Sequence, residues 1–291
     1  MATPSQWLAG ARPRTLPAAV SPVVAGSGAA LLAGRFAPVV AALCLVVALA
    51  LQVAVNYAND YSDGIRGTDA ERVGPMRLVG SGAASPPSVK RAAFAAFGVA
   101  AVAGLAVVAL SGQWWLLLVG VAAILAAWYY TGGSHPYGYA GLGEVMVFVF
   151  FGLVAVTGTT YVQAHRVTVV SVIAAVAVGL VACQVLVANN LRDIRGDREV
   201  GKRTLATRLG DRGTRVLYLA MSIVVTVAVV VLAALTSWWA LLGLAGVVLL
   251  AVATRSVVSG ATGRDLVAVL QLTGLGELLL AVGLAVGWLV P

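Results

Sequence analysis

The chain has 291 residues, of which 60% are hydrophobic and only 10% are charged, whereas soluble domains have about 45–50% and about 25%. This composition excludes a water-soluble enzyme, a disordered chain and a disulfide-stabilised domain, and it indicates that the lipid bilayer is the solvent. The formal net charge of +8 would suit nucleic acid in a soluble protein, so the positions of the basic residues have to be considered.

Apolar stretches of the length needed to cross a membrane, about 20 residues, recur along the whole chain. There are nine of them, at residues 15–33, 38–57, 92–110, 114–131, 144–161, 168–189, 215–235, 238–254 and 266–290. They predict an all-α integral membrane protein with nine transmembrane helices in one domain, residues 1–291. Most connections are short, but residues 58–91 and 190–214 are long and charged, and such loops in compact proteins are usually functional.

The lysine and arginine residues predict the orientation of these helices. With a cytoplasmic N-terminus, 17 of the 19 basic residues lie on the cytoplasmic side, and only Arg35 and Arg166 lie outside. The two long loops are then cytoplasmic, and an odd number of spans places the C-terminus on the extracytoplasmic side. We therefore expect a multi-pass protein of the plasma membrane, in which the positive charge serves the membrane and no nucleic acid is involved.

Two polar runs with similar spacing follow the second and the sixth apolar stretch. Each run has an amide and then two carboxylates three or four residues apart: Asn56, Asp60 and Asp63 in the first, and Asn189, Asp193 and Asp197 in the second. On a continuing helix such spacings share one face. Because the runs are four spans apart, they reach the same side of the membrane.

Carboxylates and amides gathered at one rim of a membrane protein indicate a binding site, because unpaired acids near lipid are costly. Oxygen ligands of this kind suit Mg²⁺, which binds one or two carboxylates together with substrate phosphates. Nearby basic side chains can hold the remaining phosphate oxygens. The sequence therefore predicts a carboxylate–Mg²⁺–diphosphate site. The alternative is a pair of solvated loops with ordinary ion pairs, and this alternative is preferred for Asp69, Glu71 and Glu199.

The sequence resembles the UbiA superfamily of intramembrane prenyltransferases over nearly its whole length. The resemblance rests on residues 11–17 (ARPRTLP), 56–63 (NYANDYSD), 129–143 (YYTGG followed by PYGYAGLG) and 189–205 (NNLRDIRGD to GKRTL). Within the superfamily, the RPRTL and YYTGG segments are similar to the branch that prenylates naphthoates. The resemblance implies a nine-helix bundle with a central cavity open toward the cytoplasm, where two Asp-rich regions hold a polyprenyl diphosphate through Mg²⁺.

The resemblance also implies roles for individual residues. The expected metal ligands and catalytic acids are Asp60, Asp63, Asp193 and Asp197. The expected substrate-binding residues are Asn56, Asn189, Asn190, Arg12, Arg77, Lys202 and Arg192. Tyr129 or Tyr130 would face the reacting allylic carbon, where an aromatic ring stabilises a cation. The chain departs from other branches at Gly64, where they commonly have an acid four residues after Asp60, and Asp63 is expected to replace it.

The implied reaction is Mg²⁺-dependent transfer of a polyprenyl group to 1,4-dihydroxy-2-naphthoate with loss of the carboxyl group, which gives demethylmenaquinol for menaquinone biosynthesis. Prenylation of 4-hydroxybenzoate, homogentisate or haem is the alternative within catalysis. A transporter of anionic amphiphiles is the non-enzymatic alternative, although transporter sites usually lie near the membrane midplane. Glu277, near the middle of the last stretch, is expected either to orient the acceptor or to hydrogen-bond a neighbouring helix.

Overall fold

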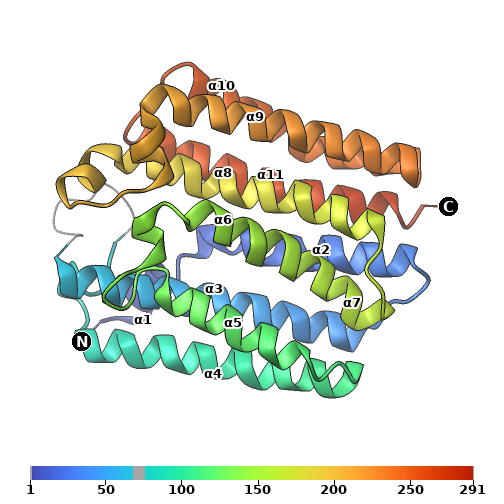
Figure 1. Cartoon of the computed structure of the whole chain (residues 1–291), viewed down its shortest axis with the longest axis horizontal. Helices are drawn as coiled ribbons and strands as arrows, with labels where there is room; N and C mark the ends of the chain where they lie inside the picture. The colour runs from blue at the N-terminus through green and yellow to red at the C-terminus, as the bar shows by residue number, and fades with distance from the viewer. Residues whose placement is uncertain (1, 68–75, 291) are drawn as a thin grey trace.

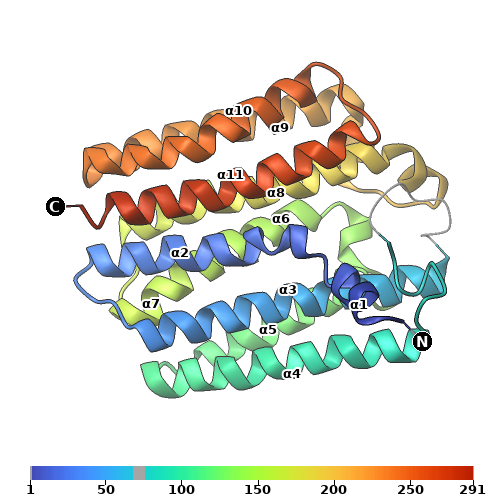
Figure 2. The ribbon, with the colours of Figure 1, turned by 180° about the vertical axis from the view of Figure 1, so that it is seen from behind.

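The computed structural model describes residues 2–67 and 76–290, which form helices and connecting turns with no strand among them. The long helices run side by side along the longest axis of the molecule, and the two chain termini lie at opposite ends of this bundle (Figures 1 and 2). Three charged residues of the first predicted loop, Asp69, Glu71 and Arg72, lie outside the described residues.

The helical elements follow the predicted apolar stretches. In chain order they are α1 (Pro4–Gly10), η1 (Pro13–Thr15), α2 (Pro17–Leu32), α3 (Pro38–Arg66), α4 (Pro86–Ser111), α5 (Leu116–Tyr129), η2 (Tyr137–Ala140), α6 (Gly143–Val147), η3 (Phe148–Thr157), α7 (Gly158–Ala164), α8 (Val169–Glu199), α9 (Leu205–Leu235), η4 (Trp238–Gly243), α10 (Leu244–Val258) and α11 (Asp265–Gly287). The elements α6, η3 and α7 form one continuous segment, as do η4 and α10.

Seven helical segments in the described part of the chain are long and apolar enough to cross a membrane, and the bent pair of α1–η1 with α2 makes an eighth. The apolar helix α5 has 14 residues and is shorter than these. Large hydrophobic side chains are exposed on the outside of the bundle, and Trp114, Trp115, Trp238 and Trp239 are exposed near helix ends, as in an aromatic belt. The chain is therefore a multi-pass membrane protein.

The two long charged regions are more helical than the loops we predicted. Helix α3 continues to Arg66 and ends at Gly67, which has the left-handed conformation (φ 71°) that terminates many helices. Helix α8 continues to Glu199, and α9 starts again at Leu205 after a short turn. Both acidic runs therefore lie on helical backbone.

The first apolar segment is interrupted between η1 and α2, and the helix axis bends by 49° there. We call this point the break before α2. Arg12 has a left-handed backbone conformation (φ 54°) at the break, and Pro13 and Pro17 begin the next helical turns, as their fixed φ and missing N–H allow. Helix α3 holds the break in place: the Asn56 amide donates to the Ala11 carbonyl at 2.9 Å and to Thr15 Oγ1 at 3.1 Å.

Candidate active site

A cavity of about 500 Å³ opens among the break before α2 and helices α3, α8 and α11. Its charged lining residues are Asp63, Asp193, Asp197, Arg12, Arg14, Arg77, Arg192 and Lys202. Of the residues that the structure describes, three acids and five cations thus face one space. The excess of positive charge makes this cavity suited to an anionic ligand.

A second cavity of about 370 Å³ adjoins the first, and the two share Gln52, Asn59, Tyr130 and Phe151 among their lining residues. Valine, alanine, leucine and phenylalanine side chains of α2, α3, α5 and the α6–α7 segment make up most of its wall. Tyr137 also lines it. Burial raises the pKa of this phenol, which donates a hydrogen bond to the Ala126 carbonyl at 2.8 Å. A ligand with an anionic head and a long apolar tail fits the pair of cavities.

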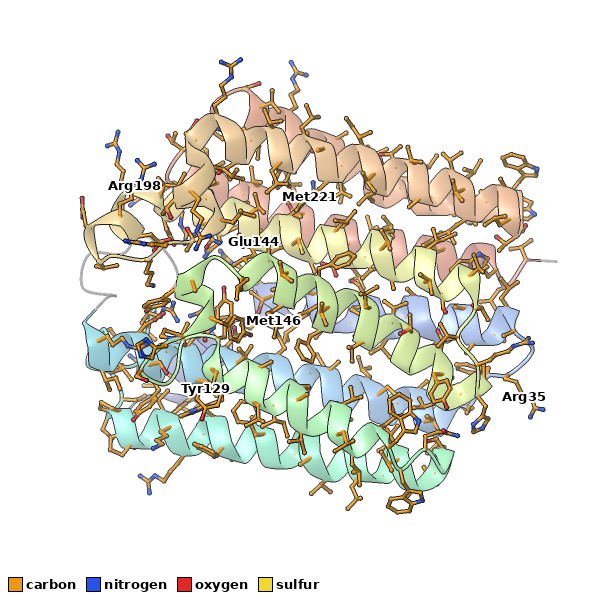
Figure 3. The ribbon with its side chains drawn as sticks, in the orientation of Figure 1. Arg35, Tyr129, Glu144, Met146, Arg198 and Met221 are labelled. Atoms are coloured by element: carbon orange, nitrogen blue, oxygen red, sulfur yellow. The ribbon has the colours of Figure 1, made fainter. Side chains whose placement is uncertain are left out.

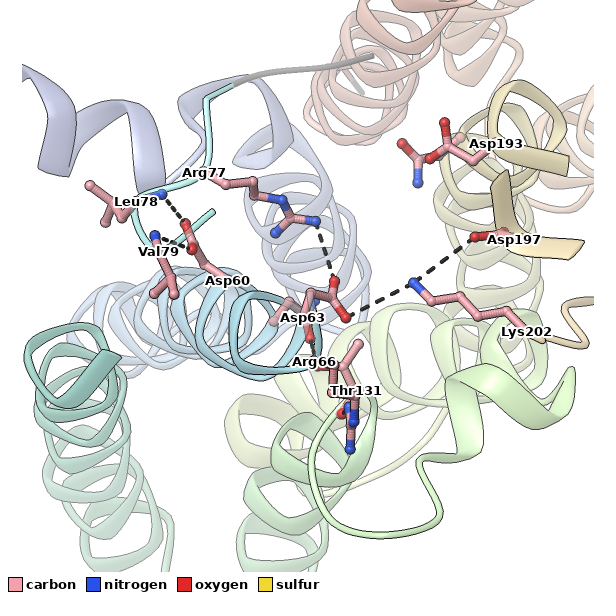
Figure 4. Close-up of polar contacts among 12 residues, drawn as sticks. Asp60, Asp63, Arg66, Arg77, Leu78, Val79, Thr131, Asp193, Asp197 and Lys202 are labelled. Carbon is pink, nitrogen blue, oxygen red and sulfur yellow. Dashed lines mark hydrogen bonds and ion pairs between the residues drawn. The ribbon is translucent and has the colours of Figure 1, made fainter. Parts of the chain in front are cut away.

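Asp63 is the centre of the polar contacts on the α3 side (Figure 4). Its carboxylate lies 3.5 Å from Arg77 Nη2 and 3.9 Å from Lys202 Nζ, and it accepts a hydrogen bond of 2.7 Å from Tyr139 Oη. Lys202 Nζ is also 3.9 Å from Asp197 and 4.3 Å from the centre of the Tyr139 ring. The ammonium group of Lys202 therefore lies between the two acidic runs.

The α8 side of the cavity is organised around Arg192. Its Nε and Nη2 atoms donate to the two carboxylate oxygens of Asp193 at 2.7 and 2.8 Å, and Nη2 also donates to Asn189 Oδ1 at 2.8 Å. The Asn190 amide points to another partner, Oε1 of the buried Glu144 in α6, at 2.9 Å. The charged cavity is lined by all three of these predicted substrate-binding residues, Asn189, Asn190 and Arg192.

Asp60 is placed differently from the other three predicted acids. It is 1% exposed and lines neither cavity. Its carboxylate oxygens accept the backbone N–H groups of Leu78 at 2.7 Å and Val79 at 2.9 Å. At 100° per residue, Asp60 and Asp63 differ in direction by about 60° around the helix, and in the structure only Asp63 lines the charged cavity. In this structure, the Asp60 carboxylate, predicted to bind the metal, contacts the backbone and does not line the charged cavity.

The two tyrosines predicted to face the reacting carbon also differ in their positions. Tyr130 lines both cavities, and its role beside the reacting carbon stays a prediction. Tyr129 is 49% exposed and lines neither cavity (labelled in Figure 3). Asn56 lines the apolar cavity, and its amide is engaged with the break before α2.

Several lining residues were not singled out from the sequence. Asn59 accepts a hydrogen bond of 2.7 Å from Thr131 Oγ1, and Tyr139 contacts Asp63 as described. Arg14 donates to the side-chain oxygen of Gln271 in α11 at 2.9 and 3.1 Å, in the amide orientation that satisfies both groups. Asn59 and Tyr139 belong to the segments that carry the family resemblance, and this resemblance is the signal that could have identified them. Gln271 has no such signal.

The donor set fits Mg²⁺ if the substrate supplies part of the coordination. Among the described residues, no three His, Cys, Asp or Glu side chains lie close enough together to hold a metal ion on their own. Mg²⁺ needs only one or two carboxylates when phosphate oxygens and water complete its shell. Asp63 and Asp197 flank one cationic group, Lys202, at 3.9 Å each, so positive charge is already accommodated between the two runs.

Glu277 follows neither of the two expectations for it. It is completely buried in α11 and lines neither cavity. Neither of its carboxylate oxygens has a hydrogen-bond partner in the described part of the chain. Glu277 is therefore neither an acceptor-binding group nor a hydrogen-bonding link between helices in this structure.

The fold and the charged cavity are those of an intramembrane prenyltransferase: the chain belongs to the UbiA prenyltransferase family, whose sequence model matches residues 19–275. It is 55% identical to the 1,4-dihydroxy-2-naphthoate octaprenyltransferase of Mycobacterium leprae over 98% of this chain and 96% of that protein. It is 54% identical to the enzyme of the same name from Mycobacterium tuberculosis over 98% and 97%.

Solved structures have the same fold at low sequence identity. An apo UbiA homologue from Aeropyrum pernix superimposes with a TM-score of 0.73 at 17% identity, over 92% of this chain and 97% of that one. A UbiA homologue from Archaeoglobus fulgidus bound to GPP and Mg²⁺ superimposes with a TM-score of 0.66 at 12% identity, over 96% and 99%. The helical arrangement described here is therefore that of the family.

Proposed function

We propose that this protein transfers a polyprenyl group from polyprenyl diphosphate to 1,4-dihydroxy-2-naphthoate in a Mg²⁺-dependent reaction, with loss of the acceptor's carboxyl group. The product is demethylmenaquinol, an intermediate of menaquinone biosynthesis. The observation that carries the proposal is the charged cavity of three acids and five cations that adjoins an apolar cavity. The choice of acceptor and of an octaprenyl donor is supported by the 55% identity to the naphthoate enzyme.

The charged residues of the cavity have complementary roles in this reaction. Asp63, Asp193 and Asp197, which line the charged cavity, would hold Mg²⁺, which acts as a Lewis acid toward the diphosphate when bound. The homologue bound to GPP and Mg²⁺ supports the use of this ion. Arg12, Arg77, Lys202 and Arg192 stabilise the negative charge that develops on the diphosphate as the allylic C–O bond breaks. Asn189 and Asn190 contribute amide groups to the same wall.

The apolar parts of the site protect the reacting carbon. Tyr130 lies where the two cavities meet, and its ring face stabilises the positive charge left on the allylic carbon. The aromatic acceptor attacks that carbon while the surrounding helices exclude water, which would otherwise capture it. The apolar cavity takes the first part of the prenyl chain, and the remainder continues into the lipid bilayer.

The membrane arrangement completes the proposal. Helix α5 and the bent α1–α2 segment are taken as spans, which gives nine crossings in the plasma membrane. The N-terminus and the two acidic runs then face the cytoplasm, and the C-terminus faces outward. The distribution of basic residues supports this orientation, and so does the position of the termini at opposite ends of the bundle (Figure 1). The diphosphate group of the prenyl donor and the naphthoate acceptor would both reach the cavity from the cytoplasm.

An assay with purified protein, octaprenyl diphosphate, Mg²⁺ and a panel of acceptors tests the function. We expect mass spectrometry to show a prenylated product from 1,4-dihydroxy-2-naphthoate that lacks one CO₂ relative to simple addition. We expect no product from 4-hydroxybenzoate, because a bicyclic ring buries more apolar area at about 25 cal/mol per Å². Comparable prenylation of 4-hydroxybenzoate, or a product that keeps the carboxyl group, would contradict the assignment of the acceptor.

A further inference from the structure

The first acidic run presents two carboxylates that make opposite kinds of contact. Asp63 faces the cavity and contacts the cationic side chains of Arg77 and Lys202. Asp60 points away from Asp193 and Asp197 (Figure 4). Its two carboxylate oxygens accept hydrogen bonds from the backbone N–H groups of Leu78 and Val79. Asp60 lines neither cavity, so its side chain would have to rotate to reach a metal ion in the charged cavity, and it would then lose hydrogen bonds to buried backbone N–H groups.

The two residues whose backbone Asp60 binds come directly after Arg77. Arg77 lines the charged cavity and lies 3.5 Å from Asp63. A carboxylate that receives two consecutive N–H groups fixes both the position and the direction of that backbone, since charge-assisted hydrogen bonds are short and directional. The side chain of Arg77 therefore enters the cavity from a backbone that Asp60 holds.

Packing supports the same segment from the apolar side. Leu78 is fully buried in a cluster with Tyr57 and Val89. A Cβ atom on Gly10 would lie 2.6 Å from Leu78, and one on Gly64 would lie 2.4 Å from Val79, so α1 and α3 contact this segment closely. Hydrophobic contacts leave some freedom to slide and rotate, whereas the two hydrogen bonds of Asp60 define one register for Leu78 and Val79.

We propose that Asp60 is a positioning residue that holds Arg77 in the diphosphate cavity through the backbone of Leu78 and Val79, and that it is not a metal ligand. This inference rests on the proposed function of that cavity. It assigns the two aspartates of the first run to separate tasks: Asp63 to the metal and Asp60 to the guanidinium that binds the diphosphate.

The test compares three single variants, Asp60→Asn, Arg77→Ala and Asp63→Asn, and the double variant Asp60→Asn/Arg77→Ala in the prenyl transfer assay. Asp60→Asn should raise the KM for the prenyl diphosphate about tenfold or more, as loss of a hydrogen bond to a charged group does. Its Mg²⁺ concentration for half-maximal activity should stay within about twofold of wild type, whereas Asp63→Asn should raise it. The double variant should be no worse than Arg77→Ala by more than about twofold, because the two residues act through one contact.

A second variant removes the contact and keeps the carboxylate. Val79→Pro lacks the N–H that Asp60 accepts, so it should reproduce the raised KM and the unchanged Mg²⁺ dependence while Asp60 is still present. Thermal unfolding in detergent identifies variants that do not fold. A raised Mg²⁺ requirement in Asp60→Asn, or effects of Asp60→Asn and Arg77→Ala that multiply in the double variant, would overturn the proposal.

Binding of inorganic diphosphate to the same variants separates this inference from the function itself, because it needs no acceptor and no turnover. If the wild-type protein forms no prenylated product, the proposed function fails. The positioning role still stands in that case if Asp60→Asn and Arg77→Ala weaken diphosphate binding equally and non-additively. It fails if Asp60→Asn binds diphosphate as wild type does.

Discussion

At the scale of single residues, Lys202 lies between the two acidic runs. Its ammonium group is 3.9 Å from both Asp63 and Asp197 and packs over the Tyr139 ring. These distances are long for direct ion pairs, so the lysine can move toward a diphosphate without breaking a strong contact.

This arrangement predicts the effect of Asp197→Asn on metal dependence. Removing the carboxylate should raise the Mg²⁺ concentration for half-maximal activity by at least about tenfold, since even outer partners of metal ligands cost about 10–100-fold in affinity. Asp211→Asn is the matched control: Asp211 is an exposed acid bound to Arg215 on α9 and does not line the cavity. A titration of activity with Mg²⁺ checks both variants. An unchanged Mg²⁺ requirement in Asp197→Asn would contradict its role.

The acids of the site were partly predictable from their spacing. Asp193 and Asp197 are four residues apart, about 40° around a helix, and both line the charged cavity. Asp60 and Asp63 are three apart, and the sequence gives no sign of which one faces inward. That depends on the segment at Leu78 and Val79, which reaches Asp60 only in the folded chain. Tyr139 was missed for a similar reason, since its partner Asp63 lies 76 residues earlier.

At the scale of helices, hydropathy located the membrane spans but not the ends of the helices. Helix α8 has 31 residues and is about 46 Å long, whereas the hydrocarbon core is about 30 Å thick. The polar remainder was predicted as part of a loop because it is charged. In the structure it stays helical, and its arginine, asparagine and aspartate side chains find partners on the same helix or across the cavity.

Close contact between α10 and α11 depends on glycine. A Cβ atom on Gly246 would lie 2.3 Å from the Gly276 carbonyl oxygen and 2.5 Å from the Leu280 nitrogen. Backbone atoms cannot move aside as a flexible side chain does, so the helices would have to separate. Small residues that allow such approach are a main source of helix association in lipid.

Gly246→Ala should therefore destabilise the protein by about 1–3 kcal/mol, the usual cost of overpacking. Gly98→Ala is the control, because Gly98 is an exposed helical position in α4 with no atom within 4 Å of the added methyl group; it should be neutral or stabilising by up to about 1 kcal/mol. Thermal unfolding in one detergent measures both. Equal melting temperatures for Gly246→Ala and wild type would show that this contact does not hold the helices together.

At the scale of the whole molecule, the charged cavity lies at one end of the helical bundle. The side chains that line the charged cavity come from the break before α2 and from the charged ends of α3 and α8. Arg198 lies near this end of the bundle, and Arg35 lies at the opposite end (Figure 3). In the proposed orientation, which follows the positive-inside rule, the charged cavity faces the cytoplasm, where a soluble acceptor and Mg²⁺ would be available.

Labelling of single cysteines tests this orientation. Arg35→Cys and Arg198→Cys replace exposed side chains at the two ends and outside both cavities. The background needs Cys44 replaced by serine, because it is partly accessible, whereas Cys183 is buried. A membrane-impermeant maleimide added to intact cells should label Arg35→Cys and leave Arg198→Cys unlabelled, and inverted vesicles should give the reverse. Labelling of Arg198→Cys in intact cells would place the acidic runs outside. The prenyl diphosphate would then have to reach the cavity from the extracytoplasmic side, and the proposed orientation would be wrong while the helical fold remained.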